Sequence, residues 1–182
     1  MENLILGNYK IENSKDSDDK LYFTGYCCHF NSENINREIV DENSFKTFFE
    51  MYNDKKLIPI VNYNHDNNQI IGGVSSIISD KTGLYMEAYL SKGVKINDEM
   101  IIPNVLNGTL TGLSTEGYIL DNIVEERGES YYVPGFLLTA IAVTPHPADH
   151  LAHLSPLSLN SYIEQLKAAK KIHNRSKIVL FL

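Results

Sequence analysis

Residues 70–90 contain the pattern that most constrains how this chain can fold. Neighbouring residues on a β-strand point to opposite sides of the sheet, so a strand with one buried face alternates between two kinds of side chain. Over 84–90, one face carries Leu84, Met86, Ala88 and Leu90, and the other carries Tyr85, Glu87 and Tyr89. The run over 70–79 is also strand-like, and a turn at 80–83 ends in a glycine that we expect to adopt a positive φ. The segment therefore predicts a β-hairpin.

Much of the remaining chain also predicts strands. Aromatic and β-branched residues concentrate in further strand-like runs, at 21–30, 57–64, 110–120 and 131–144. Apolar spacing or a capping box predicts helices at 45–52, 97–106 and 161–173. Ser44 can cap the first helix, and Pro103 must break or kink the second. Together these elements predict a mostly β fold (α+β): a closed or partly open β-barrel of about six or seven strands with helices packed outside.

The segments between these elements are polar and are expected to lack regular structure. Residues 31–43 read as a loop. Residues 121–130 contain four acidic residues and are expected to form a solvent-exposed loop. Residues 145–156 are rich in proline and histidine and are expected to be irregular. We expect one compact domain over 1–154, followed by a C-terminal helical tail over 155–182.

Length and charge exclude several classes of function. A chain of 182 residues favours one domain. Its 16 Lys and Arg against 23 Asp and Glu give a net charge of −7, which argues against electrostatic binding to nucleic acid or to an anionic membrane. No apolar run approaches the roughly 20 residues of a transmembrane helix, and the first ten residues are too polar for a signal peptide. We expect a soluble, intracellular protein.

The two cysteines agree with that location. Cys27 and Cys28 are adjacent on a predicted strand, so they point to opposite faces and are poorly placed to form a disulfide. Two thiols with no partners elsewhere indicate a reducing compartment. Each is expected to serve as a small buried apolar residue.

Two side chains in separate predicted strands have the chemistry of a nucleophile and its base. His65 follows the strand at 57–64, and Ser114 lies between Gly112 and Gly117, glycines that indicate close backbone approach. A serine becomes nucleophilic when a neighbouring base takes its proton, and a neutral imidazole suits this role near pH 7. Taken singly, however, His65 is typical of a hydrogen-bonded surface histidine and Ser114 of an ordinary strand hydroxyl.

The segment 145–153 offers a second chemistry. Spacings of four and three residues would place His146, His150 and His153 on one face of a helix, where three imidazoles and a water could hold zinc. Pro147 would be tolerated in the first turn of such a helix. A zinc-dependent hydrolase is therefore one alternative function. The other interpretation is a polar turn without metal, and we expect no metal and no cofactor.

Short motifs around His65 and Ser114 follow one another in a characteristic order. They are FTGY at 23–26, EIVDENSF at 38–45, NHD at 64–66, IIGG at 70–73, DKTGLYMEAYL at 80–90, GLS at 112–114 and AIAVTPHPA at 140–148. Each motif is short, but their order and spacing from about residue 21 to 152 resemble the prohead maturation proteases of tailed phages. That family is related to the herpesvirus assemblin proteases.

The resemblance implies a herpesvirus-protease-like barrel and a serine endopeptidase in which Ser114 is the nucleophile and His65 the general base. It also implies a third triad member on the closing strand, at the position that Ala140 occupies here. Alanine cannot orient an imidazole, so a substitute is expected among Thr139, Glu87 and His146. Without a substitute, the chain would be an inactive structural or scaffold protein of the capsid.

The oxyanion of the reaction requires backbone donors, which the resemblance places in the turn at 144–149. Pro145 and Pro147 have no N–H, so the backbone of Ala148 and of Asp149 are the expected donors, beside His146.

The resemblance also implies a biological setting. Proteases of this family process capsid precursor and scaffold proteins, and often themselves, during phage head maturation. We therefore expect such substrates, self-cleavage and a homodimer, with no nucleic acid or membrane as partner. The expected location is the host cytoplasm, inside the immature capsid. The tail over 155–182 either packs on the barrel or binds scaffold or a second subunit.

Overall fold

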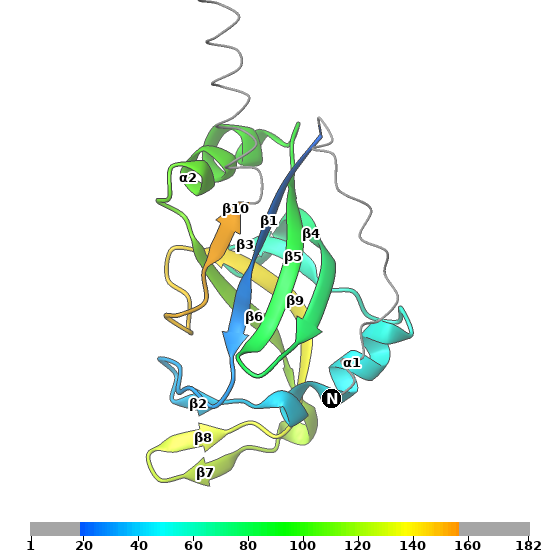
Figure 1. The fold of residues 1–182 in the computed structure, drawn as a ribbon, viewed down its shortest axis with the longest axis vertical. Helices are drawn as coiled ribbons and strands as arrows, with labels where there is room; N and C mark the ends of the chain where they lie inside the picture. The colour runs from blue at the N-terminus through cyan, green and yellow to red at the C-terminus, as the bar shows by residue number, and fades with distance from the viewer. Residues whose placement is uncertain (1–18, 157–182) are drawn as a thin grey trace, which may run out of the picture.

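A curled sheet of seven strands is the main element of residues 19–156, the part of the chain that this computed structural model describes (Figure 1). Its strands, in spatial order, are β10 (Leu154–Pro156), β1 (Lys20–His29), β5 (Gly83–Ser91), β4 (Asp66–Ser79), β3 (Ile60–Tyr63), β9 (Phe136–Thr144) and β6 (Gly112–Ile119). All neighbouring strands run antiparallel except β3 and β9, which are parallel. The mostly β architecture expected from the sequence is confirmed.

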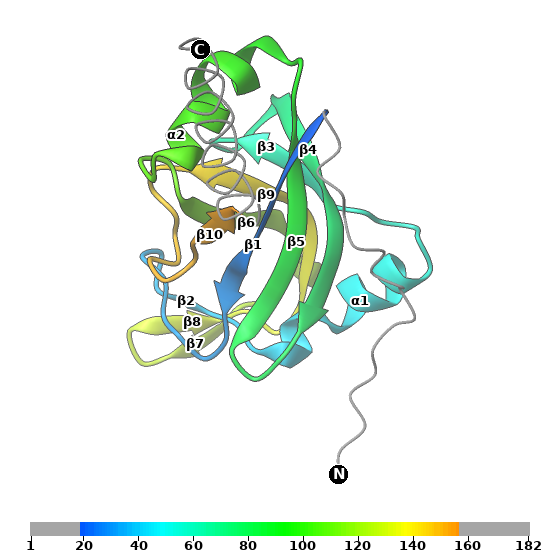
Figure 2. The same cartoon turned by 45° about the horizontal axis from the view of Figure 1, so that its top comes forward.

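The sheet curls until strands from its two ends approach each other. β1 and β6 lie side by side in both views (Figures 1 and 2). The segment before β10 joins them, because Leu113 N–H donates to Ala152 O (2.9 Å) and Leu154 N–H donates to Thr111 O (2.8 Å). Within residues 19–156, the rest of β6 has only β9 as a hydrogen-bonded neighbour. The result is a partly open barrel.

The β4–β5 hairpin forms as the alternating pattern predicts. Leu84, Met86, Ala88 and Leu90 are all fully buried on the face that lines the core. Gly83, however, does not adopt the positive φ expected for it. A Cβ at this position would collide with the carbonyl oxygen of Cys28 on the neighbouring strand β1. Glycine is therefore required here for the close approach of two backbones, and not for the conformation of the turn.

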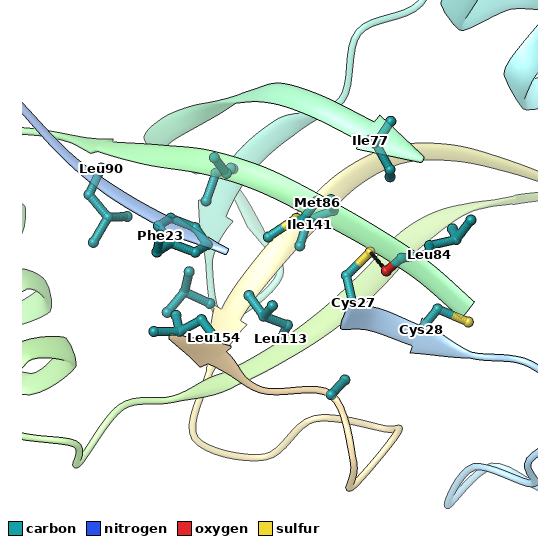
Figure 3. Packing of buried hydrophobic residues seen from close by; sticks show 14 of the residues in the cluster. Phe23, Cys27, Cys28, Ile77, Leu84, Met86, Leu90, Leu113, Ile141 and Leu154 are labelled. Carbon is teal, nitrogen blue, oxygen red and sulfur yellow. Dashed lines mark hydrogen bonds between the residues drawn. The ribbon is translucent and has the colours of Figure 1, made fainter. Parts of the chain in front are cut away.

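The interior of the barrel is apolar (Figure 3). Phe23 from β1, Met86 from β5, Leu113 from β6 and Ile141 from β9 are fully buried in one cluster. Each such side chain contributes about 1.5–3 kcal/mol relative to leaving it exposed. Because Leu113 points inward, its neighbour Ser114 must point to the outer face of the sheet.

The predicted helix at 45–52 is confirmed, with an earlier start. Asp41 is its N-cap: the Asp41 side chain accepts hydrogen bonds from the N–H groups of Asn43 and Ser44, and the Ser44 hydroxyl accepts one from Asp41 N–H. A 3-10 turn (Glu42–Phe45) then leads into α1 (Lys46–Asn53). Ser44 is therefore the third residue of a capping box instead of the cap itself.

The predicted helix at 97–106 forms in two parts. A π-helical turn (Asn97–Ile101) leads directly into α2 (Ile102–Leu106), and Pro103 lies in the first turn of α2. No helix within residues 19–156 has the length and apolar character needed to cross a membrane. The helix expected at 161–173 lies outside the described residues.

A second sheet of three strands projects at one end of the barrel (Figure 1). Its strands are β2 (Glu38–Ile39), β8 (Ser130–Tyr132) and β7 (Glu125–Arg127). Residues 31–43 and 121–130 were expected to lack regular structure, which is wrong in part because they contain β2 and β7. The segment 145–156 also ends in a strand, β10. The reason is pairing between distant segments: β2 pairs in parallel with β8. Local polar composition contains no information about such a partner.

Cys27 and Cys28 are both buried, as the sequence predicts. Burial raises the pKa of the Cys28 thiol to about 12, with a further contribution from the nearby Asp149 carboxylate. Burial also raises the pKa of Cys27 well above its ordinary value. Both thiols therefore remain protonated near neutral pH, and the thiolate is the reactive form of cysteine.

We expect neither cysteine to react with iodoacetamide in the folded protein at pH 8, because each thiol is buried and protonated. Both should be alkylated after unfolding in urea. Mass spectrometry of the protein treated before and after unfolding measures the difference. Alkylation of folded Cys28 as fast as that of the unfolded chain would contradict this expectation.

Candidate active site

A cavity of about 360 Å³ lies between β6 and the segment that follows β1. Its apolar lining includes Cys27, Cys28, Val40, Phe45, Ile119, Val133 and Phe136. Its polar side chains are those of His29, Ser32, Asn34, Asn36, Glu38, His65, Ser114, Thr115, Glu116 and Asp149. The two residues expected from the sequence to act as base and nucleophile, His65 and Ser114, thus face one cavity.

The tight turn between β3 and β4 presents His65. Asn64 and His65 are the two residues between these strands, and their φ values are 51° and 63°. Positive φ at both positions is typical of the type I′ turn that two-residue hairpins favour, and Asn and His tolerate it better than most residues. Asn64 N–H donates to Val143 O (3.1 Å), and the Thr144 hydroxyl donates to Asn64 Oδ1 (2.9 Å). These bonds fix the turn to β9.

β6 presents Ser114 on the outer face of the sheet. Ser114 is only 4% exposed, yet it lines the cavity. A Cβ on either Gly112 or Gly117 would collide with a backbone carbonyl oxygen of β9. The close backbone approach that these glycines predicted is confirmed, and it holds β6 tightly against β9.

Glu116 lies two residues after Ser114, on the same face of β6. Its Oε2 is 3.3 Å from Nδ1 of His65. Asn62 Nδ2 donates to Glu116 Oε2 (3.1 Å), and Asn67 Nδ2 donates to Oε1 (2.5 Å). Asn62 Nδ2 also donates to Asn67 Oδ1 (2.8 Å), so the two amides support each other. One carboxylate is therefore held by β3, by the turn and by β4.

These partners keep the Glu116 carboxylate ionised. Partial burial raises its pKa, but the hydrogen bonds from Asn67, Asn62 and His65 outweigh this effect and hold the pKa below its usual value. An ionised carboxylate can only accept hydrogen bonds, so Nδ1 of His65 must be the donor. In the neutral ring, Nε2 is then free to accept a proton from a hydroxyl. These are the parts of a Ser–His–carboxylate triad.

None of the three candidates expected for the third position is hydrogen-bonded to His65 in the described part of the chain, whereas Glu116 is. Thr139 Oγ1 donates to the backbone oxygen of Glu116 (3.3 Å). Glu87, on β5, lies opposite Thr24 of β1. His146 N–H donates to the Thr144 hydroxyl (3.3 Å). None of the three lines the cavity.

Sequence reasoning missed Glu116, although its signal was present. Residues two apart on a strand share a face and are separated by about 6.6 Å, a gap that one imidazole can bridge. The motif from Ser114 to Glu116 has this spacing. The register of the sheet adds a second clue, because Glu116 lies directly opposite Ala140 on β9.

Opposite residues in an antiparallel pair have Cβ atoms about 4.5–5.5 Å apart on one face. A carboxylate on β6 can therefore occupy the space of the side chain that the resemblance expects on β9. Ala140 is almost completely buried, and its methyl group leaves that space to Glu116.

The loop between β9 and β10 contributes Ala148 and Asp149 to the cavity lining. Pro147 anchors this loop beside the strand of Ser114, because a Cβ at Gly112 would lie 2.8 Å from Pro147 Cδ. Within residues 19–156, the backbone N–H groups of Ala148 and Asp149 donate no hydrogen bond. They remain able to bind an oxygen atom of a ligand in the cavity.

The zinc site considered for His146, His150 and His153 is wrong. Residues 145–153 form turns and bends instead of a helix, since Pro145 and Pro147 remove two backbone donors. The His153 ring is instead hydrogen-bonded to the Thr111 hydroxyl (3.2 Å) and to the His150 carbonyl oxygen (3.0 Å). In the described part of the chain, no three His, Cys, Asp or Glu side chains gather closely enough to hold a metal ion.

Comparison with known proteins adds independent information. A family model described as caudovirus prohead serine protease matches residues 8–167. A search of curated proteins finds no match.

Solved structures of viral proteases are similar in fold. The bacteriophage T4 capsid assembly protease, gp21, superposes with a TM-score of 0.56 at 17% sequence identity, over 69% of this chain and 82% of that chain. The KSHV protease, solved with a hexapeptide phosphonate inhibitor, superposes with a TM-score of 0.50 at 10% identity, over 74% of this chain and 63% of that chain. The herpesvirus-protease-like fold expected from the sequence is confirmed.

We expect Glu116→Gln to lower the melting temperature more at pH 7 than at pH 3. Because the pKa of Glu116 is lowered in the folded protein, its contribution to stability is complete above the unfolded-state pKa of about 4. That contribution is lost as the pH falls through the lower folded-state value. Calorimetry of both proteins between pH 7 and pH 3 measures the difference. A difference in melting temperature that does not change with pH would show that the charge contributes nothing.

Proposed function

The chain belongs to the caudovirus prohead serine protease family, and from this premise we propose that Ser114, His65 and Glu116 are its nucleophile, general base and orienting carboxylate. One observation carries the proposal. The three side chains line a single cavity, with Glu116 hydrogen-bonded to Nδ1 of His65. The carboxylate thereby leaves Nε2 of the ring available to the serine.

The proposed reaction is peptide hydrolysis through an acyl-enzyme. His65 Nε2 takes the hydroxyl proton while Ser114 Oγ forms a bond to the carbonyl carbon of the substrate. His65 then gives this proton to the leaving amine as the C–N bond breaks. A water molecule, deprotonated by the same imidazole, attacks the ester, and His65 gives that proton to Ser114 Oγ as the ester C–O bond breaks. The Glu116 carboxylate stabilises the imidazolium that forms in both halves of the reaction.

The tetrahedral intermediate places negative charge on the former carbonyl oxygen. We assign its stabilisation to the backbone N–H groups of Ala148 and Asp149, which line the cavity and have no other hydrogen-bond acceptor within residues 19–156. A donor of this kind is typically worth about 10²–10³ in rate.

The open edge of β6 suggests how a peptide binds. Beyond Ser114, the strand pairs with β9 on one side only within the described chain, so its other edge retains backbone donors and acceptors. An extended substrate can add to such an edge as a further strand. This binding mode would place the scissile bond next to the nucleophile, which lies where the unpaired edge begins.

The alternative of an inactive structural or scaffold protein loses its basis. It rested on Ala140, which cannot orient an imidazole, and Glu116 lies directly opposite that residue. The family consists of serine proteases, so the chain is a serine peptidase of capsid maturation.

The family also defines the substrates in general terms. A prohead protease acts on capsid precursor and scaffold proteins, within the capsid in the host cell. We propose in addition that the chain cleaves itself and forms a homodimer. The support for a dimer is the set of exposed apolar side chains on and beside the small sheet, Ile123, Val124 and Tyr131. Light scattering after size-exclusion chromatography measures the mass of the particle.

Ser114→Ala should abolish both peptide cleavage and labelling by a fluorophosphonate, with a loss of at least about 10³-fold, because no other activated nucleophile lines the cavity. His65→Asn should have a similar effect and still fold, since asparagine tolerates a positive φ. Labelling, cleavage of co-expressed capsid precursor and shortening of the chain itself are followed by mass spectrometry.

Ser75→Ala, at an exposed strand serine, is the matched control and should retain full activity. Wild-type labelling at a residue other than Ser114 would disprove the assignment of the nucleophile.

Glu116→Gln should lower the labelling rate by up to about 10⁴-fold, the cost of losing the orienting carboxylate in Ser–His–Asp enzymes. Glu87→Gln, on β5, removes the carboxylate of one of the three candidates expected from the sequence and should leave the rate unchanged. Rates are measured with the same fluorophosphonate. Equal rates for Glu116→Gln and wild type would remove Glu116 from the mechanism.

A further inference from the structure

A second histidine–carboxylate pair faces the same cavity. His29, the last residue of β1, and Asp149, in the loop before β10, both line it. Asp149 Oδ2 lies 2.8 Å from His29 Nδ1 and also accepts the His29 backbone N–H at 2.8 Å. Each side chain is only 15% exposed. The pair therefore joins two segments 120 residues apart, which lie side by side in both views (Figures 1 and 2).

The Asp149 oxygens are all engaged in holding the loop. Besides the two bonds to His29, Asp149 Oδ1 accepts Leu151 N–H (3.0 Å), and Asp149 O accepts Ala152 N–H (3.0 Å). One residue earlier, Ala148 O accepts Ile35 N–H (3.0 Å). The carbonyl oxygens of Ala148 and Asp149 and the Asp149 carboxylate are thus held by hydrogen bonds. The backbone N–H groups of the same two residues have no acceptor within residues 19–156.

The charge state of the pair follows from the same contacts. Burial raises the pKa of Asp149, but hydrogen bonds from Leu151 N–H and from the His29 ring and backbone hold it below its usual value. The carboxylate is ionised and accepts, so Nδ1 of His29 donates. A charge-assisted hydrogen bond of 2.8 Å between two largely buried groups is short and strong. The Tyr26 ring, with its centroid 5.3 Å from that of His29, limits the movement of the imidazole.

We propose that His29 is a positioning residue: by holding the Asp149 carboxylate, it fixes the backbone N–H groups of Ala148 and Asp149 at the oxyanion of the reaction. This inference rests on the proposed function and adds a residue to it. His29 does not touch the reacting atoms. It acts through the loop, because a preorganised donor stabilises developing charge without having to reorganise during the step.

The predicted effect is confined to the chemical step. In His29→Leu the ring can no longer donate to Asp149, so the loop loses one of its two ties to β1 and the N–H groups lose their fixed direction. Loss of one oxyanion donor typically costs about 10²–10³ in rate, so a displaced pair should cost about tenfold or more. Initial binding should remain unchanged, because His65 and the β6 edge are untouched.

The experiment uses the full chain and a fluorophosphonate at increasing concentration, which separates the maximal labelling rate of Ser114 from the half-saturating concentration. His29→Leu should lower the maximal rate about tenfold or more without changing the half-saturating concentration. His29→Asn should restore it to within about threefold, because the amide nitrogen can occupy the place of Nδ1. A rate for His29→Leu equal to wild type, or no recovery in His29→Asn, would overturn the proposal.

His150→Leu is the matched control on the same loop, since that side chain is exposed and outside the cavity lining. It should label at the wild-type rate, and a fall equal to that of His29→Leu would overturn the proposal. Thermal unfolding verifies that each variant is folded. If His29→Leu does not fold, Asp149→Asn provides the measurement, with the same fall in maximal rate expected and an unchanged rate refuting the role. Failure of wild-type protein to label at Ser114 would instead disprove the proposed function.

Discussion

The position of β9 in the sheet is the constraint on which the site depends. It pairs in parallel with β3 and antiparallel with β6, so it holds both strands that present the proposed catalytic groups. The turn with His65 is tied to the end of β9 through Asn64, and the glycines flanking Ser114 bring β6 against the same strand. Since the inner faces of these strands are packed into the core, their outer faces cannot shift independently. The apolar core thereby fixes the geometry of a polar site on the other face of the sheet.

Two carboxylates have separate tasks in this cavity. Glu116 is held by two amides and is the proposed orienting group for the imidazole of His65, whereas Asp149 is held by His29 and by backbone N–H groups and is the proposed anchor of a loop. In both cases hydrogen bonds to the ionised form outweigh burial and lower the pKa. Neither group is therefore suited to act as a general acid near neutral pH. In the proposed mechanism, proton transfer is left to His65, the more exposed of the two histidines in the cavity.

Glu116 and Ala140 are cross-strand partners, so a side chain at this place on the sheet can come from either of two strands. Cross-strand partners on one face are nearly interchangeable as sources of a side chain, because they lie only about 5 Å apart. The sequence of β9 alone shows alanine where the resemblance expects the third triad residue. The structure shows the Glu116 carboxylate on β6, directly opposite Ala140.

The sequence alone determined the elements with strong local signals: the β4–β5 hairpin from its alternation, α1 from its apolar spacing, and the burial of Cys27 and Cys28. It also selected His65 and Ser114, through motifs whose order resembles a protease family. It did not determine contacts between distant segments, because side-chain spacing contains no information about partners. Tertiary structure decided the pairing of β2 with β8, the close approach required at Gly83, the absence of a zinc cluster within residues 19–156, and the meeting of Glu116 with His65. The strand order is the physical reason, since only β9 separates β3 from β6, and this order brings the outer face of β6 to a turn 51 residues earlier in the chain.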